Sequence, residues 1–134
     1  ADIIIKVAAV ADYRPAAPEA AKIKKDGSQA DQTLVLKENT DILAMIGQAK
    51  RSDQFLAGFA AETHDLETHA LAKMKKKNLD MIAANVVGKA DSGFGCDTNK
   101  VTLFFKDGRR ADLDLMAKDR VAHAILDQIA GSCG

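Results

Sequence analysis

The chain has 134 residues, 47% of them hydrophobic, and its 19 basic and 19 acidic side chains give a formal net charge of zero. This length fits one domain, residues 1–134, with a sizeable hydrophobic core. A neutral chain has no bulk electrostatic attraction to nucleic acid or to a membrane surface. We therefore expect neither partner, and any anion site must be local.

The cysteine and histidine residues match no ligand pattern. Cys96 and Cys133 lie far apart and outside any zinc or redox spacing, which is typical of reduced thiols in a cytoplasmic protein. His64, His69 and His123 also fit no metal-ligand spacing, so we expect no metal bound by the protein itself. The sequence shows neither a signal peptide nor an apolar run of the roughly 18–20 residues that span a bilayer.

The first 50 residues predict two strands, a loop and a helix. Residues 3–10 are nearly continuously apolar, which predicts a strand covered on both faces. Residues 12–32 contain both prolines and several lysines, and predict a long polar loop that is either functional or disordered. After a short strand at 33–37, Asn39 or Thr40 is expected to cap a helix. Its predicted apolar face consists of Ile42, Met45, Ile46 and Ala49.

The rest of the chain alternates strands and helices. Strands are predicted at 54–61 and 79–84, separated by a helix over 65–77 that buries Leu66, Ala70 and Met74. Strands at 101–105 and 110–115 flank Asp107-Gly108, a typical hairpin turn. A last helix at 117–130 turns Val121, Ala124, Ile125 and Ile129 inward. This order predicts an α/β fold: a mainly parallel sheet between helices, with an added antiparallel hairpin.

The predicted sheet suggests where a ligand would bind. In open α/β sheets, ligands lie beyond the carboxyl ends of the strands, beside helix N-termini. Residues 8–14, residues 59–63 and the segment from Asn85 onward fall at such ends. The sequence therefore predicts a small-molecule site, without identifying the molecule.

Clustered lysines offer a second, ambiguous signal. Lys22, Lys24 and Lys25 lie in the predicted loop, and Lys73 and Lys77 are one helical turn apart. Converging lysines can bind a triphosphate, but lysines at a helix end also simply complement the helix dipole. Neither of the usual glycine-rich phosphate-binding motifs occurs, and no nucleophile is paired with a base. Covalent catalysis by this chain is therefore not expected.

Five segments in one order resemble the phosphopantothenate–cysteine ligase family. They are Ala-Ala-Val-Ala-Asp-Tyr-Arg-Pro (8–15), Lys-Ile-Lys-Lys (22–25), Leu-Lys-Glu-Asn-Thr-Asp-Ile-Leu (36–43), Gly-Phe-Ala-Ala-Glu-Thr (58–63) and Lys-Asn-Leu-Asp-Met-Ile-Ala-Ala-Asn (77–85). The resemblance implies a Rossmann-like three-layer sandwich, a homodimer, and CTP-dependent, Mg²⁺-dependent joining of 4′-phosphopantothenate to cysteine through an acyl-cytidylate. In bacteria this ligase is usually one half of a bifunctional protein, and only the other, decarboxylase half binds FMN.

The same resemblance implies roles for individual residues. Lys22 matches the family's catalytic lysine in a mobile flap, Lys73 and Lys77 match phosphate-contacting lysines, and Phe59 matches the residue beside the cytosine. Further nucleotide contacts are implied for Lys6, Val7, Ala8, Asp12, Thr40, Asp41, Ile42 and Leu43. From the residues alone, Phe59 could equally be a core side chain, and Asp41 could serve only to cap its helix.

The family domain normally begins nearly a hundred residues earlier than this sequence. We therefore expect a C-terminal fragment of a larger ligase domain, one that keeps the CTP contacts but lacks full ligase activity. Two other functions stay open: a nucleotide-sensing module without chemistry, and nucleic-acid binding through the lysines. The second is disfavoured by the zero net charge and by an aromatic content of only 4%.

Overall fold

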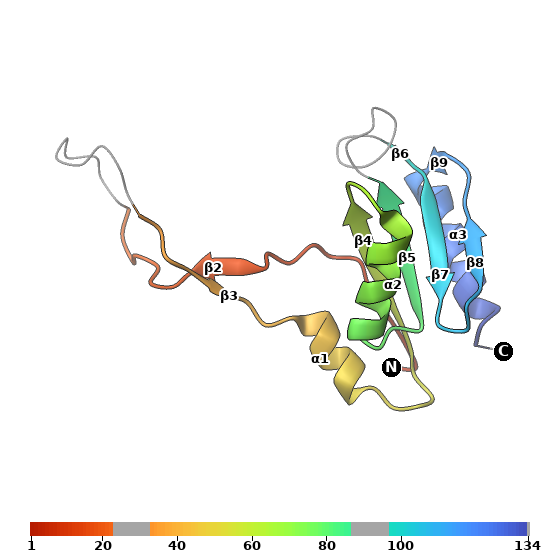
Figure 1. Cartoon of the computed structure of the whole chain (residues 1–134), viewed down its shortest axis with the longest axis horizontal. Helices are drawn as coiled ribbons and strands as arrows, with labels where there is room; N and C mark the ends of the chain where they lie inside the picture. Colours follow the sequence, from red (N-terminus) through yellow and green to blue (C-terminus); the bar gives the residue numbers. More distant parts are fainter. Residues whose placement is uncertain (23–32, 87–96, 134) are drawn as a thin grey trace. The chain divides into compact units, whose positions relative to one another are not determined.

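The structure, a computed structural model, describes residues 1–22, 33–86 and 97–133. The chain divides into two compact units (Figure 1): Ala1–Val7 with Ile42–Gly134, and Ala8–Asp41 between them in sequence. The first unit contains β1 (Ile3–Lys6), α1 (Ile42–Ala49), β4 (Phe55–Glu62), α2 (Leu66–Lys76), β5 (Met81–Val86), β6 (Thr98–Asn99), β7 (Val101–Phe105), β8 (Arg110–Asp112), β9 (Met116–Ala117) and α3 (Lys118–Ala130). The second contains β2 (Tyr13–Pro15) and β3 (Leu36–Glu38).

A five-stranded sheet forms the centre of the first unit, in the order β1-β4-β5-β7-β8. The strands β1, β4 and β5 pair in parallel, with Ile5 opposite Ala57 and Ala57 opposite Met81. The strands β7 and β8 pair antiparallel and form the predicted hairpin, in which Gly108 has a φ of 88°. A positive φ is readily adopted by glycine, which explains the Asp-Gly signal.

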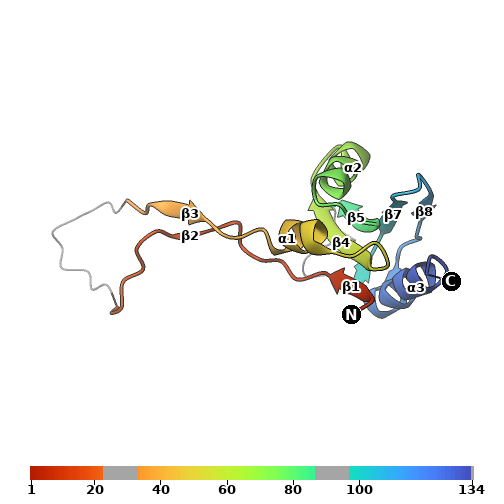
Figure 2. The same cartoon turned by 90° about the horizontal axis from the view of Figure 1, so that it is seen from below.

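Helices cover both faces of this sheet. One buried cluster joins Leu43 of α1 and Met74 of α2 to Leu56 and Ile82 of the sheet. The other joins Val121 and Ile129 of α3 to the alternate strand residues, whose side chains point to the opposite face of the sheet. These are Ala57, Met81, Ala83, Val101, Leu103 and Phe105. Figure 2 shows α2 and α3 on opposite sides of the strands. The predicted three-layer α/β fold is therefore confirmed.

The first strand is shorter and more exposed than predicted. It ends at Lys6 instead of residue 10, and Ile3 and Ile5 are exposed. The physical reason is its place in the sheet, since β1 is an edge strand with β4 as its one neighbour among the described residues. The run of apolar residues predicted a strand that is covered on both faces. In the described residues, this edge strand is not fully covered on either face.

The first helix buries a different face from the predicted one. Leu43 and Gly47 are buried, whereas Ile42 and Met45 are exposed. A Cβ at Gly47 would lie 1.9 Å from the carbonyl oxygen of Lys77, so the helix backbone itself packs against the end of α2. The helix begins at Ile42, so Asp41, and not the predicted Asn39 or Thr40, directly precedes it, and the side chain of Asn39 donates to the carbonyl of Ala11 (2.7 Å).

The second unit corrects the predicted loop. Within residues 12–32, Tyr13–Pro15 forms β2 and pairs antiparallel with β3. The backbone N–H of Asn39 donates to the carbonyl of Asp12 (2.7 Å), extending the ribbon. The predicted strand at 33–37 is displaced slightly to Leu36–Glu38, and Lys24 and Lys25 lie outside the described residues.

The remaining predicted helices and strands are present, but β8 ends at Asp112 and not at residue 115 as predicted. In α2, Ala70 and Met74 are buried and Leu66 packs against them. In α3, Val121 and Ile129 are buried. The short β6–β9 pairing had no sequence signal, because each strand has only two residues. In the described residues, no helix has both the length and the apolar character needed to cross a membrane.

Candidate functional site

The parallel strands of the first unit end at one edge of the sheet. Their last residues are Lys6, Glu62 and Val86, and α2 begins four residues after Glu62. This is the edge at which open α/β sheets bind ligands. The side chains at this edge therefore form the candidate site.

Glu62 is the centre of a charged cluster at this edge. Its Oε1 accepts from the Nζ of Lys73 at 3.2 Å, and its Oε2 lies 3.3 Å from the Nδ1 of His69. The side chain of Glu62 is only 16% exposed, whereas that of Lys73 is 35% exposed. Lys73 is thus oriented by a carboxylate while its ammonium group still faces solvent, an arrangement that can bind an anion.

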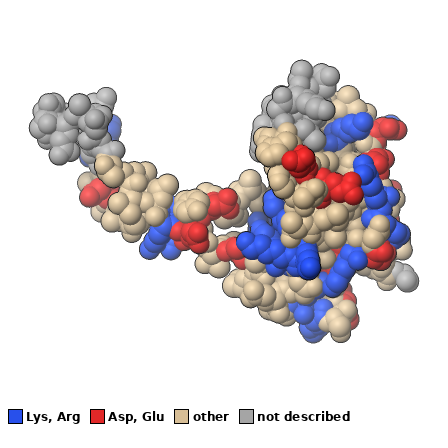
Figure 3. Space-filling view, viewed as in Figure 1, with Lys and Arg blue, Asp and Glu red and all other residues tan. Residues whose placement is uncertain are grey.

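The helix α2 separates charge along its length. Glu67 lies in its first turn, and Lys73, Lys75 and Lys76 lie in its last turn. Figure 3 shows acidic atoms over the beginning of this helix and basic atoms over its end. Lys77 follows the last helical residue and is half-buried, and its carbonyl packs against Gly47 near the amino ends of the strands, so its backbone lies away from the Glu62 cluster.

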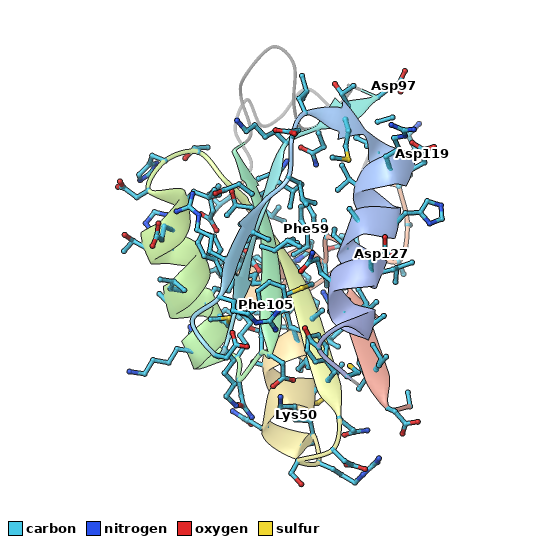
Figure 4. The ribbon with its side chains drawn as sticks, turned by 90° about the vertical axis from the view of Figure 1, so that its right-hand side faces the viewer. Lys50, Phe59, Asp97, Phe105, Asp119 and Asp127 are labelled. Atoms are coloured by element: carbon cyan, nitrogen blue, oxygen red, sulfur yellow. The ribbon has the colours of Figure 1, made fainter. Side chains whose placement is uncertain are left out.

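An apolar cavity lies on the opposite face of the sheet. It has a volume of about 380 Å³, and its walls include Val7 at the end of β1, Phe59 of β4 and Ile125 of α3. Figure 4 shows Phe59 between the sheet and α3. Phe59 is partly buried and packs against the α3-side core. Phe59 is therefore both a core residue and part of the cavity wall, so its position is compatible with a role in the core and with a role beside a bound base.

A buried polar pair adjoins this cavity. Asn85 at the end of β5 donates through Nδ2 to Oδ1 of Asn99 (3.0 Å), and Asn99 lines the cavity. Asn85 is 3% exposed, and among the described residues its own Oδ1 has no hydrogen-bond partner. A buried acceptor without a partner carries a free-energy cost, which a ligand donor can relieve.

The other predicted contact residues of the first unit have different surroundings. Lys6 lies opposite Gly58 in the sheet register and is half-buried, and Val7 is exposed. Ile42 is exposed, whereas Leu43 is buried in the α2-side core. The structure thus gives Leu43 a clear packing role.

The predicted contacts in the second unit are exposed. Ala8, Asp12, Lys22, Thr40 and Asp41 all have exposed side chains. Asp12 takes part in the ribbon through its backbone carbonyl.

Within the first unit, the structure brings together Val7 and Phe59, and separately places Lys73 beside Glu62. These two groups lie on opposite faces of the sheet, since Phe59 packs on the α3 side and α2 covers the other. Sequence reasoning missed the roles of Glu62, His69 and Asn99. The sequence analysis included Glu62 in a motif but assigned it no role, because its contact with Lys73 depends on how β4 and α2 pack.

A second cavity, of about 440 Å³, lies at the amino end of the strands. Its walls include Asp53, Asp80, Arg109 and Cys133. Beside it, Lys50 forms an ion pair with Asp80, and the backbone N–H of Leu56 donates to the same carboxylate (2.7 Å). None of the residues predicted to bind nucleotide lines this cavity.

The chain is similar to known proteins over nearly its whole length. It is 50% identical over 130 residues to the coenzyme A biosynthesis bifunctional protein CoaBC of Bacillus subtilis, covering 96% of this chain and 31% of that protein. It is 44% identical over 127 residues to CoaBC of Vibrio cholerae, covering 95% and 32%. The chain therefore spans about a third of the length of these relatives.

A solved structure agrees with these sequence matches. The crystal structure of the C-terminal domain of CoaBC superposes with a TM-score of 0.71 at 40% identity, covering 98% of this chain and 56% of that one. The family model for the DNA/pantothenate metabolism flavoprotein C-terminal domain matches residues 1–132. The chain therefore belongs to the family of DNA/pantothenate metabolism flavoprotein C-terminal domains, with strong similarity to the C-terminal part of bacterial CoaBC.

Proposed function

We propose that this chain provides the nucleotide-binding part of an enzyme that ligates 4′-phosphopantothenate to cysteine with CTP, in the biosynthesis of coenzyme A. The observation that carries the proposal is the 50% identity to CoaBC over 96% of the chain. The family model matches residues 1–132, a range that contains every predicted contact residue from Lys6 to Lys77.

The proposed reaction has two steps. The carboxylate of 4′-phosphopantothenate attacks the α-phosphate of CTP, forming an acyl-cytidylate and releasing pyrophosphate. The amine of cysteine then attacks the acyl carbon, forming an amide and releasing CMP. This chemistry needs no protein nucleophile. It needs groups that orient the reactants and compensate the negative charge of the phosphates.

We assign these roles by position in the sequence motifs. Lys73 and Lys77 contact the triphosphate, Phe59 lies beside the base, and Lys22 is the catalytic lysine over the acyl-cytidylate. The remaining nucleotide contacts in this proposal are Lys6, Val7, Ala8, Asp12, Thr40, Asp41, Ile42 and Leu43. Leu43 would contribute its backbone, since its side chain is buried in the core.

The surroundings of Lys73 and Phe59 support this assignment. Lys73 keeps an ammonium group partly exposed while Glu62 orients it. The apolar cavity beside Phe59 offers a stacking surface, and the neighbouring Asn85 Oδ1 could accept from an exocyclic amine. Cytosine and adenine both carry such an amine, so the choice of CTP over ATP rests on the family resemblance.

Mg²⁺ enters this proposal with the nucleotide. Mg²⁺ prefers oxygen ligands in octahedral geometry. In the part of the chain that the structure describes, the one group of three neighbouring ligand side chains contains two imidazoles, which do not suit Mg²⁺. The described residues therefore do not fit a Mg²⁺ site of their own.

We also propose that the intact protein is a homodimer. The second unit is a two-stranded ribbon, which is marginally stable by itself in water. It exposes apolar side chains, namely Val10, Tyr13, Leu34, Val35 and Leu36. Pairing with a second copy would bury this surface. Light scattering should then give a dimer mass, and replacement of Leu34 and Leu36 by Asp should give a monomer.

A chimaera tests the proposed activity. This chain would replace the matching 130 residues of the Bacillus subtilis relative, which is 50% identical. We expect pyrophosphate release that requires CTP and 4′-phosphopantothenate, repeated turnover that also requires cysteine, and loss of both in the Lys22→Ala chimaera. A folded chimaera that releases no pyrophosphate would contradict the ligase function.

The alternative function is a nucleotide-binding module without catalysis. It predicts that the chimaera binds CTP but releases no pyrophosphate even with both other substrates present. The same assay with CTP binding measured in parallel therefore separates the two functions.

A further inference from the structure

We propose that His64 and Asp65, in the turn between β4 and α2, and His69, at the start of α2, form a binding site for a transition-metal ion of the Zn²⁺ class. One ligand atom from each of these side chains lies within 4.8 Å of the other two. Sequence analysis did not predict this site, because the two histidines have no recognised ligand spacing. The left-handed conformation of Asp65 (φ 45°) brings them together at the start of α2.

Neighbouring side chains already orient both imidazoles. The Nδ1 of His69 lies 3.3 Å from Oε2 of Glu62, and the Nδ1 of His64 lies 2.9 Å from the hydroxyl oxygen of Thr63. Metal-bound histidines almost always use their second ring nitrogen in this way, most often toward a carboxylate. With both Nδ1 atoms engaged, the Nε2 atoms are left as the metal ligands.

The donor set selects the class of metal. Two imidazoles and one carboxylate suit Zn²⁺, Co²⁺, Ni²⁺ and Cu²⁺, whereas Mg²⁺ and Ca²⁺ prefer oxygen ligands alone. A tetrahedral Zn²⁺ ion with Zn–N distances of about 2.1 Å would use these three ligands and keep its fourth position for water. The two imidazole rings, with centroids 5.1 Å apart at 77°, need only small side-chain rotations to converge on one ion.

Local charges set the expected affinity. The positive end of the α2 dipole opposes a cation, and so does Lys73, which shares Glu62 with His69. The carboxylates of Asp65 and Glu62 oppose both effects. We therefore expect Zn²⁺ to bind less tightly here than at closed four-ligand sites. This site uses neither Phe59 nor Lys22 and does not depend on the proposed ligase function.

The test is a titration of the complete chain with Zn²⁺ in competition with a chromophoric chelator. We expect one ion per chain and at least tenfold weaker binding in His64→Ala and in His69→Ala. His123→Ala removes an exposed histidine of α3 and serves as the matched control. It should leave the affinity unchanged, as should Cys133→Ser, which removes an exposed thiol.

A second measurement separates imidazole from thiolate ligands. Co²⁺ bound to nitrogen and oxygen lacks the strong charge-transfer absorption of a cobalt–thiolate bond, and we expect that absorption to be absent. Equal affinities of the wild type and the His64→Ala/His69→Ala double variant would overturn the site. So would thiolate absorption, or binding that depends on His123.

Discussion

The two ends of the central sheet each carry a lysine–carboxylate pair, but the pairs differ in burial and in what surrounds them. At the amino end, Lys50 and Asp80 are 7% and 20% exposed, and Asp80 also accepts from the backbone of Leu56. At the carboxyl end, Lys73 is 35% exposed, and its partner Glu62 is shared with His69.

This difference distinguishes a charged pair that is part of the packed core from a lysine that is accessible to a ligand. A buried pair with its hydrogen bonds satisfied stabilises the fold, because removal of one partner leaves the other buried and unpaired. A half-exposed lysine held by a shared carboxylate contributes little stability, yet it can move to an incoming anion. The pair at the amino end thus belongs to the packed core, whereas the pair at the carboxyl end leaves a lysine that is available to the proposed ligand.

The sharpest test of the comparison removes one charge from each pair. Asp80→Asn should lower the free energy of unfolding by about 3 kcal/mol, because Lys50 loses its partner in a buried place. Glu62→Gln, the matched change at the carboxyl end, should cost about 1 kcal/mol, because the unpaired Lys73 is 35% exposed and stays solvated, although Glu62 itself is only 16% exposed. Chemical denaturation measures both. Equal losses would show that the two ends do not differ as described.

A substitution of Gly47 also tests the packing at the amino end of the sheet. Gly47→Ala should destabilise the chain by about 2–3 kcal/mol, because the added methyl would lie 1.9 Å from the Lys77 carbonyl oxygen. Gly131→Ala is the control, since a Cβ there meets nothing closer than 3.5 Å. Thermal unfolding should show a large loss for the first and little change for the second. A neutral Gly47→Ala would mean that α1 does not pack closely on α2.

The carboxyl end should respond in nucleotide binding. In the chimaera with the Bacillus subtilis relative, Lys73→Ala should raise the KM for CTP about tenfold, since it removes one charge-assisted contact to phosphate. Lys76→Ala removes an exposed lysine from the same helical turn. Its KM should stay close to that of the unaltered chimaera. A similar rise in both variants would indicate general electrostatics instead of a specific contact.

The smallest change in stability is expected for Asp112, on the surface of β8. Hydrogen bonds from Arg110 and then from Thr102 hold the pKa of Asp112 below its usual range. A carboxyl group with a lowered pKa stabilises the fold above its unfolded pKa of about 3.9, and this stabilisation is lost as the pH falls through the folded value. The Tm of Asp112→Asn should therefore lie slightly below wild type at pH 6 and converge with it near pH 2. A constant difference would exclude this linkage.

Much of the fold was predictable because local patterns and tertiary packing agree. The face of α2 with Leu66, Ala70 and Met74 packs as its spacing predicts, and the Asp-Gly turn joins β7 and β8. The α1 face was mispredicted because its packing depends on a backbone contact at Gly47, which hydrophobic spacing does not reveal.

The candidate site was less predictable, for a physical reason. Motif resemblance picked out Phe59 and Lys73, but the sequence did not reveal that their side chains are associated with opposite faces of the sheet. Strand register and helix placement also determine the contact of Glu62 with Lys73, 11 positions away, and that of Asn85 with Asn99, 14 positions away. Such contacts have no short-range sequence pattern.

The most direct test of the central claim, that this chain carries a nucleotide site at the carboxyl end of its sheet, is calorimetric titration of the folded chain with CTP and Mg²⁺. ATP and the Lys73→Ala variant serve as comparisons. The account predicts binding of CTP in preference to ATP, weakened by Lys73→Ala. A folded chain that binds no CTP, or binds it equally well without Lys73, would contradict the claim.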